Sequence, residues 1–306
     1  MTRQEYIHLL ADREALRRII ADIPADDIIT GGSFRSRLEE VEHEIASNQV
    51  DDRVPARARL TFRGKPVIAN HGIFAEFGMK ATNAFTDVVA KVAAALSGPL
   101  GSAGRVPNRD QHQLLITSTA IGSFGFELEE HRSDQLPFSE DSPTAEALKL
   151  TTSLLESTLG TDDELADAAA ATDPRALAAV RAFLGTLADN EAFCAVEFQG
   201  KAWRFPDAGA VRTSLARISQ DNLREDESLL DGEFQGVLPK RRTFEFKLAA
   251  DESVIAGKVG PEIADPDAIN RHLHESISIK VMTTQVGSGR PRYTLLREPQ
   301  WRDAQP

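Results

Sequence analysis

The chain has 306 residues, of which 41% are hydrophobic and 27% are charged, and its length predicts two domains of about 150 residues each. Residues 228–306 hold 11 of the 35 basic and 11 of the 47 acidic side chains, so the whole net charge of −12 lies in residues 1–227. That acidic part repels phosphate backbones, which disfavours broad nucleic-acid binding, and no run approaches the ~20 apolar residues of a membrane-spanning helix.

The first 50 residues predict a pair of amphipathic helices. Apolar side chains recur at helical spacing through residues 2–22, Pro24 follows where a helix should stop, and the charged start predicts no signal peptide. After Gly31-Gly32, the capping-box sequence SRLE at residues 36–39 predicts the start of the second helix. The apolar face of this hairpin needs a partner, which predicts docking on another protein or self-association. The contact residues that we expect are Leu9, Leu16 and Ile20.

Two further segments follow along the chain. Residues 51–135 predict an α+β unit. Its strand–turn–strand, helix and hairpin (or single bent strand) are expected at residues 56–69, 78–98 and 113–131. Residues 136–190 predict a helical connector, in which Asp173-Pro174 supplies an N-cap and a first-turn residue. The connector helices are expected near residues 143–159, 162–171 and 174–189.

Residues 191–306 predict a second α+β unit that ends in a small barrel. A strand–turn–strand at 193–205 and a helix at 207–219 come first. The stretch 232–259 then alternates aromatic and branched residues with charged ones and is broken twice by turns, which predicts three strands. A short helix and two more strands are expected at residues 265–273, 276–284 and 292–296. Five short strands with one interrupting helix resemble an OB-type barrel.

The predicted fold class is therefore α+β, with a helical N-terminal hairpin, two α+β units joined by a helical segment, and a C-terminal β-barrel-like meander. The sequences RARLTFRGKPV (57–67) and AVEFQGKAW (195–203) share the form strand, Phe-x-Gly-Lys, strand. A helix and then a hairpin follow in both cases. The two units are therefore either an internal repeat or independent uses of a common hairpin turn.

The order helix, three strands, helix and strand from residue 207 onward resembles the core of the PD-(D/E)xK nuclease superfamily. Asp231 stands at the expected start of the first strand, and Glu245-Phe-Lys247 lies on the second. The resemblance implies that the two carboxylates hold Mg²⁺ while Lys247 assists the attacking water. Leu230 stands where the family has proline. The alternative is a solvated face on which opposite charges support one another across strands.

The C-terminal unit also carries basic side chains near aromatic ones, which are the ingredients of a surface for single-stranded nucleic acid. The phosphate-facing candidates are Lys240, Arg241, Arg242, Arg290 and Arg292. Phe244 and Phe246 alternate with charged residues, which favours their filling the barrel. This pattern leaves a nucleic-acid-binding component of a mobile-element or antiphage defence system as an alternative function.

The sequence gives little indication of a metal site, a reactive thiol or a nucleotide-binding loop. On an extended segment His272 and His274 would face the same way beside the carboxylate of Glu275, which suits a metal, but a third ligand is not evident locally, and we expect no metal. Cys194 lies on an apolar strand and is expected to be a core thiol. The sequence contains no phosphate-binding loop of the GxxxxGK[ST] type, so we expect no cofactor.

These observations favour a non-enzymatic adaptor or regulatory subunit of a bacterial multi-protein system. The metal-dependent nuclease is the second alternative, after the nucleic-acid-binding component. A single cysteine cannot form an internal disulfide, which predicts a cytoplasmic location. Partners are expected to be a protein or a second copy of the chain at the N-terminal hairpin, with nucleic acid at the C-terminal unit and no membrane.

Overall fold

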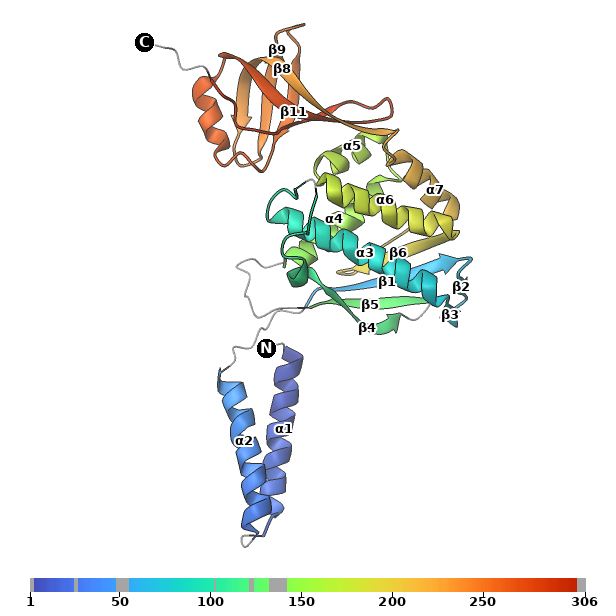
Figure 1. The fold of residues 1–306 in the computed structure, drawn as a ribbon, viewed down its shortest axis with the longest axis vertical. Helices are drawn as coiled ribbons and strands as arrows, with labels where there is room; N and C mark the ends of the chain where they lie inside the picture. Colours follow the sequence, from blue (N-terminus) through green and yellow to red (C-terminus); the bar gives the residue numbers. More distant parts are fainter. Residues whose placement is uncertain are drawn as a thin grey trace. The chain divides into compact units, whose positions relative to one another are not determined.

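The computed structural model describes residues 3–24, 27–47, 55–101, 103–120, 124–131 and 142–301 (Figure 1). The chain forms two compact units. Residues 1–55 with 132–136 make up the hairpin unit, and residues 56–131 with 137–306 make up the body unit. The predicted mixed α+β class is confirmed, and no helix in the described ranges is long and apolar enough to cross a membrane.

The hairpin unit consists of α1 (Arg3–Asp22) and α2 (Ile28–Ser47), which pack against each other. The first helix ends before Pro24 as predicted, but the predicted start of the second helix is wrong. Asp27 caps that helix, because its Oδ1 accepts the backbone N–H of Thr30 at 3.1 Å. Gly31 and Gly32 therefore lie inside α2, although glycine in a helix costs about 1 kcal/mol relative to alanine.

The body unit begins with a five-stranded antiparallel sheet in the order β4-β5-β1-β6-β7. Its strands are β1 (Arg57–Gly64), β4 (Leu114–Ala120), β5 (Phe124–Glu130), β6 (Ala192–Phe198) and β7 (Lys201–Arg204). In the central strand, Leu60 lies between Phe126 of β5 and Val196 of β6. Strands from the second and fourth predicted segments therefore share one sheet, while the predicted domain boundaries stay predictions.

Helices cover one face of this sheet (Figure 1). They are α3 (Ala75–Leu96), α4 (Pro143–Ser157), α6 (Pro174–Asp189) and α7 (Ala208–Arg217), while α5 (Asp162–Ala170) packs against α4 and the barrel strands β11 and β12. Phe85 of α3 and Phe183 of α6 meet edge to face, with ring centroids 5.6 Å apart, in the same core as Leu60. Asp173 caps α6 as predicted, accepting the backbone N–H of Arg175 at 2.8 Å. The three helices of the predicted connector thus share a core with the sheet.

The opposite face of the sheet is charged, and ion pairs join its strands. Arg59 of β1 pairs with Glu127 of β5 at 2.8 Å and with Glu197 of β6 at 3.6 Å. These partners are direct cross-strand neighbours in the sheet register. Alternation along β1 therefore sends apolar side chains into the helical layer and charged ones outward.

The FxGK sequences occupy different turns. In the second, Gln199 and Gly200 both have positive φ, 49° and 75°, and join β6 directly to β7. The strand that follows the first, β2 (Val67–Ile68), pairs instead with β3 (Gly72–Ile73). An internal repeat stays a prediction.

The C-terminal part of the body unit is a closed barrel in the strand order β10-β12-β11-β8-β9, as predicted. Its strands are β8 (Leu223–Leu238), β9 (Thr243–Leu248), β10 (Val254–Val259), β11 (Ser276–Val286) and β12 (Arg292–Leu295). The ring of Phe234 meets those of Phe244 and Phe246 at 5.8 and 5.1 Å in the barrel core. The short 3-10 helix η2 (Pro266–His272) packs against β8.

Strand β8 is longer than the sequence indicated. It begins at Leu223, so Asp231 lies in its middle and not at its start, which corrects the prediction. Leu223 pairs with Val286 of β11, and both side chains belong to the core beneath the helices. Further along, Ile279 of β11 belongs to the barrel core. The β8–β11 ribbon therefore connects the two cores of the body unit.

Candidate functional site

The three residues of the nuclease-like pattern lie on the outer face of the barrel. Phe244 and Phe246 point into the core, so Glu245 and Lys247 point outward, as the alternation predicted. Asp231 is exposed and accepts a hydrogen bond from the Ser278 hydroxyl of β11. The register does not set Asp231 opposite either of the other two.

The partners of Lys247 come from other positions. Its ammonium pairs with Glu252 at 3.6 Å, and its cross-strand neighbour is Glu233. Glu245 is opposite Gly236, beyond a bulge in the β8–β9 pairing. Across the described ranges, no group of three or more His, Cys, Asp or Glu side chains is placed to hold a metal ion. Assignment of a nuclease activity to these residues stays a prediction.

Two of the five predicted phosphate-facing residues are engaged inside the body unit. The Arg242 guanidinium donates to the backbone carbonyls of Val259 at 3.3 Å, of Ile263 at 2.9 Å, and of Gly260. Arg292 donates to the carboxylates of Asp163 and Asp167 on α5, and these bonds raise its pKa. Arg242 therefore holds the end of β10 and the residues after it, and Arg292 joins β12 to α5.

The other three predicted basic residues are exposed. Lys240 and Arg241 lie side by side in the turn between β8 and β9. The backbone N–H of exposed Arg290 lies 3.4 Å from an Asp163 carboxylate oxygen. No ion pair with another described residue engages these three side chains. They remain available to a ligand.

The histidine segment serves packing. His272 stacks on Trp301 with ring centroids 4.3 Å apart, and its Nδ1 lies 3.0 Å from a Glu275 oxygen. His274 is exposed and has a positive φ of 64°. Cys194 is buried in the sheet core as predicted, and burial raises the pKa of its thiol, which makes it unreactive.

The residues expected to make partner contacts lie on α1 with unequal burial. Leu16 is 6% exposed and packs in the hairpin itself, as does Val41 of α2 at 0%. Leu9 and Ile20 are only half-buried, and the neighbouring Ile19 is 40% exposed. One of the three expected residues thus forms the internal core of the hairpin, and the other two still present apolar surface.

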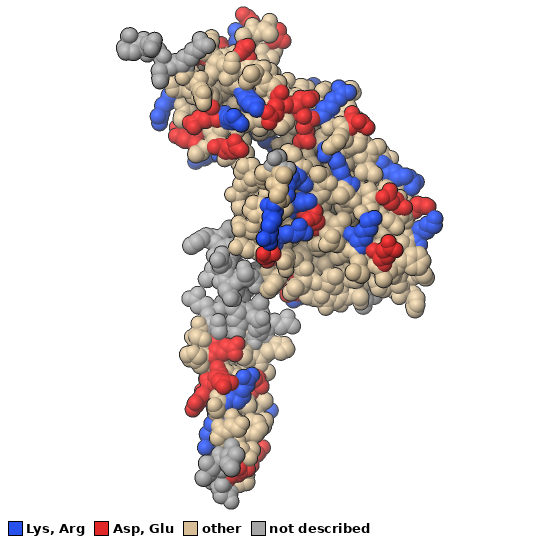
Figure 2. Space-filling view, in the orientation of Figure 1, with Lys and Arg blue, Asp and Glu red and all other residues tan. Residues whose placement is uncertain are grey.

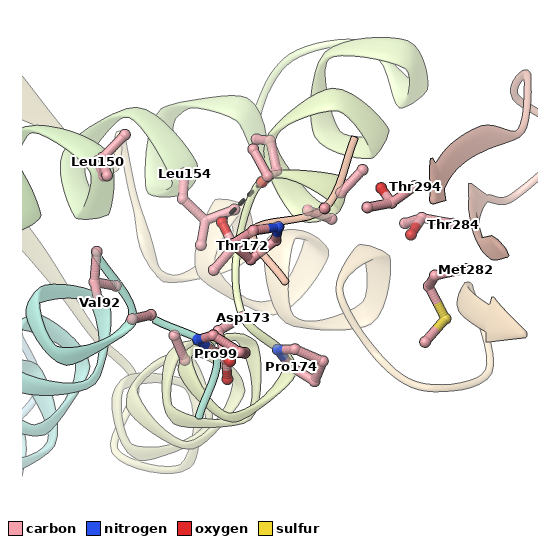
Figure 3. A pocket seen from close by; sticks show the side chains of 18 of the residues that line it. Val92, Pro99, Leu150, Leu154, Thr172, Asp173, Pro174, Met282, Thr284 and Thr294 are labelled. Atoms are coloured by element: carbon pink, nitrogen blue, oxygen red, sulfur yellow. Dashed lines mark hydrogen bonds between the residues drawn. The ribbon is translucent and has the colours of Figure 1, made fainter. Parts of the chain in front are cut away.

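The body unit also contains a cavity of about 410 Å³, which we call the junction cavity, between the helical layer and the barrel (Figure 3). Val92 of α3 and Leu154 of α4 line it on the helical side. Met282 and Thr284 of β11, with Thr294 of β12, face them from the barrel side. A volume of this size is typical of small-molecule sites, ~300–1,000 Å³.

The charged groups of the junction cavity differ in what they can do. Both oxygens of Asp173 accept backbone N–H groups, from Arg175 at 2.8 Å and from Leu100 at 2.9 Å, so this carboxylate is structural. Burial raises the pKa of Glu225, although Arg181 lies 3.9 Å away and opposes the shift. Burial also lowers the pKa of Arg181. Glu225 therefore keeps its proton to a higher pH than an exposed glutamate does.

The lining of the junction cavity favours binding. Its described residues supply apolar surface, hydroxyl groups and carboxyl groups, but no thiol, imidazole or amine. The sequence did not reveal this cavity, because its walls come from α3, α4, α5, β11 and β12. Asp173-Pro174 was the one local signal, and it was correctly assigned to the helix cap.

No family model matches the chain, and no curated protein or solved structure is significantly similar to it.

Proposed function

We propose that the protein is a non-enzymatic adaptor or regulatory subunit that assembles through the α1–α2 hairpin, and that the hairpin pairs with a second copy of itself. The observation that carries this proposal is the incomplete burial of the apolar stripe on the hairpin. Of the apolar side chains whose burial the structure describes, Leu16 and Val41 are buried. The half-buried members are Tyr6, Leu9, Leu10, Ile20, Ile23, Phe34, Leu38 and Ile45.

Two helices alone make a weak structure. Each helix has 20 residues, and isolated helices of that size gain most of their stability from packing of the apolar face. A second hairpin would complete a four-helix bundle and cover the exposed parts of Leu9, Ile19 and Ile20.

The charge distribution favours a second copy as the partner. Residues 3–22 contain four basic and four acidic side chains, and residues 28–47 contain two basic and four acidic ones. A twofold interface places each patch against its own copy, so a strongly charged hairpin would repel itself. Because basic and acidic side chains are nearly balanced in each helix, the repulsion between two copies of the hairpin is small. Within one hairpin, Arg17 already pairs with Glu42 at 2.7 Å.

The test is the mass of the full chain measured by light scattering after size exclusion. The wild-type protein is expected at twice the 33.4 kDa of one chain. Leu9→Glu and Ile20→Glu place a charge on the stripe and are expected to give the single-chain mass. Ala11→Glu is the matched control, because it adds the same charge at an exposed position of α1 and should leave the mass unchanged.

Circular dichroism separates loss of assembly from loss of the helices. If Ile20→Glu keeps its helicity and still has twice the mass of one chain, the apolar stripe is not the interface. A single-chain wild type would refute self-association. A single-chain wild type that binds a different protein through the hairpin would refute pairing with a second copy, while retaining the adaptor role.

A nucleic-acid-binding component of a mobile-element or antiphage system is the second candidate. The exposed, adjacent Lys240 and Arg241 favour it. Fluorescence anisotropy with a labelled oligonucleotide tests this candidate. Affinity should fall with rising salt, and Lys240→Glu with Arg241→Glu should reduce both the affinity and the salt slope. Equal binding by the double variant would eliminate this turn as the contact surface.

A further inference from the structure

A second cavity of the body unit has a lining unlike that of the junction cavity. It measures about 560 Å³ and is lined by the end of α3, the loop after it, the 3-10 helix η1 (Arg109–His112) and the start of α6. We call it the basic cavity. Its cationic side chains are Lys91, Arg105, Arg109 and Arg175. Figure 2 shows Lys and Arg gathered over the end of α3 and the loop that follows it.

Hydrogen bonds to the loop fix one wall of the basic cavity. The guanidinium of Arg175 donates to the carbonyl of Gly101 at 3.1 Å and to that of Gly104 at 2.7 Å. The N–H of Leu100 is held by Asp173, the cap of the same helix. Gly104 has a φ of +94°, which a residue with a side chain rarely adopts. The loop is therefore anchored to the start of α6 through residues 100, 101 and 104, just before Arg105.

A single carboxylate holds two cations on the other wall. Asp87 of α3 pairs through Oδ2 with Lys91 at 2.6 Å and through Oδ1 with Arg109 at 2.9 Å. Arg105 is exposed and makes no ion pair with any residue in the described ranges. The carboxylate of Asp110 also belongs to the lining.

The charges leave the basic cavity with an excess of cations. Four cationic side chains face two carboxylates, those of Asp87 and Asp110, in a chain whose net charge is −12. Like charges gathered in one concave site raise its affinity for anions, because the walls focus the field. An acidic protein with a cationic cavity therefore selects a compact anion over an extended polyanion, which the rest of its surface repels.

We propose that the basic cavity binds the phosphate group of a small molecule. Guanidinium groups match phosphate oxygens with two parallel hydrogen bonds, and Arg105 supplies an exposed guanidinium that no ion pair with a described residue engages. The volume suits a ligand of small-molecule size. This site goes beyond the proposed assembly role, because it lies in the body unit and uses no residue of the hairpin.

The test is isothermal titration of the full chain with inorganic phosphate, pyrophosphate and ATP at low salt. Pyrophosphate is expected to bind more tightly than phosphate, and added NaCl is expected to weaken both. Arg105→Ala should weaken pyrophosphate binding by about tenfold, the loss of one charged hydrogen-bonding group. Arg212→Ala is the control, because Arg212 is exposed on α7 and does not line the cavity.

The variant Arg105→Ala should fold normally, since its side chain is exposed, and a thermal melt checks this. No binding of any of the three probes at about 10 mM would overturn the proposal. Equal affinity of Arg105→Ala and wild type would also overturn it, because the anion would then bind elsewhere. Binding of a short oligonucleotide without binding of pyrophosphate would show a nucleic-acid surface in place of a small-molecule site.

Discussion

Arg242 offers the sharpest separation of a structural role from a nucleic-acid contact. Its guanidinium donates to three backbone carbonyls, those of Val259, Gly260 and Ile263. Gly260 and Ile263 are buried, so Arg242→Ala removes a charged donor from carbonyl groups that water reaches poorly, although the Gly260 carbonyl keeps the N–H of Ile263 at 3.2 Å. We expect Arg242→Ala to destabilise the barrel.

The loss of unfolding free energy in Arg242→Ala can be estimated from its three hydrogen bonds. A hydrogen bond to a charged group contributes ~1.5–3 kcal/mol, and bonds from one side chain are not additive. Arg242 is half-buried, which reduces the sum through solvent screening. The expected loss in unfolding free energy is therefore about 2–4 kcal/mol. Arg242→Lys should restore less than half of it, because an ammonium cannot span three carbonyls.

Urea unfolding followed by tryptophan fluorescence measures this loss. The chain has two tryptophans, Trp301 beside the barrel core and Trp203 beside the core under the helices. In Arg242→Ala, the fluorescence of Trp301 should change at a lower urea concentration than that of Trp203. Arg241→Ala is the matched control, since its side chain is exposed, and should change stability by no more than ~0.5 kcal/mol. Equal stability of the Arg242 and Arg241 variants would refute the structural role.

Three further predictions concern the body unit. Phe246→Ala removes a side chain that is 0% exposed and should cost about 3–5 kcal/mol in unfolding free energy, which urea titration would measure; a loss under ~1 kcal/mol would contradict the barrel core. Because burial raises the pKa of Glu225, the stability linked to that group is present below its unfolded pKa and lost as pH rises through its folded pKa. Glu225→Gln should therefore gain stability relative to wild type as the pH rises above about 4, the ordinary pKa of a glutamate, and an unchanged difference would contradict the burial argument. Lys247→Ala removes one surface ion pair with Glu252 and should change the unfolding free energy by less than about 1 kcal/mol. Magnesium-dependent DNA cleavage that this variant loses would instead support the nuclease alternative.

Local signals predicted the elements well. Pro24 marked the end of α1, and Asp173-Pro174 marked the start of α6, because capping and proline chemistry act within a few residues. The glycine pair misled, since tertiary packing and the Asp27 cap carry α2 through Gly31 and Gly32. Alternation along residues 232–259 correctly predicted the strands of the barrel.

Long-range partners could not be predicted from the sequence. The pairing of β1 with β6 joins segments more than a hundred residues apart, and β10 closes the barrel by lying parallel to β12. The same limit applies to the basic side chains. Nothing in the turn sequence at residues 239–242 distinguishes exposed Arg241 from Arg242, which three backbone carbonyls engage. Contacts of that kind depend on which carbonyl groups the fold brings near.

The central claim is that the apolar stripe of the hairpin is completed by a second copy. Sedimentation equilibrium of the wild-type chain over a dilution series at micromolar concentrations tests it most directly. The account predicts a mass of twice 33.4 kDa that falls toward the single-chain value on dilution. A mass of 33.4 kDa at every concentration, with α1 and α2 helical, would contradict it.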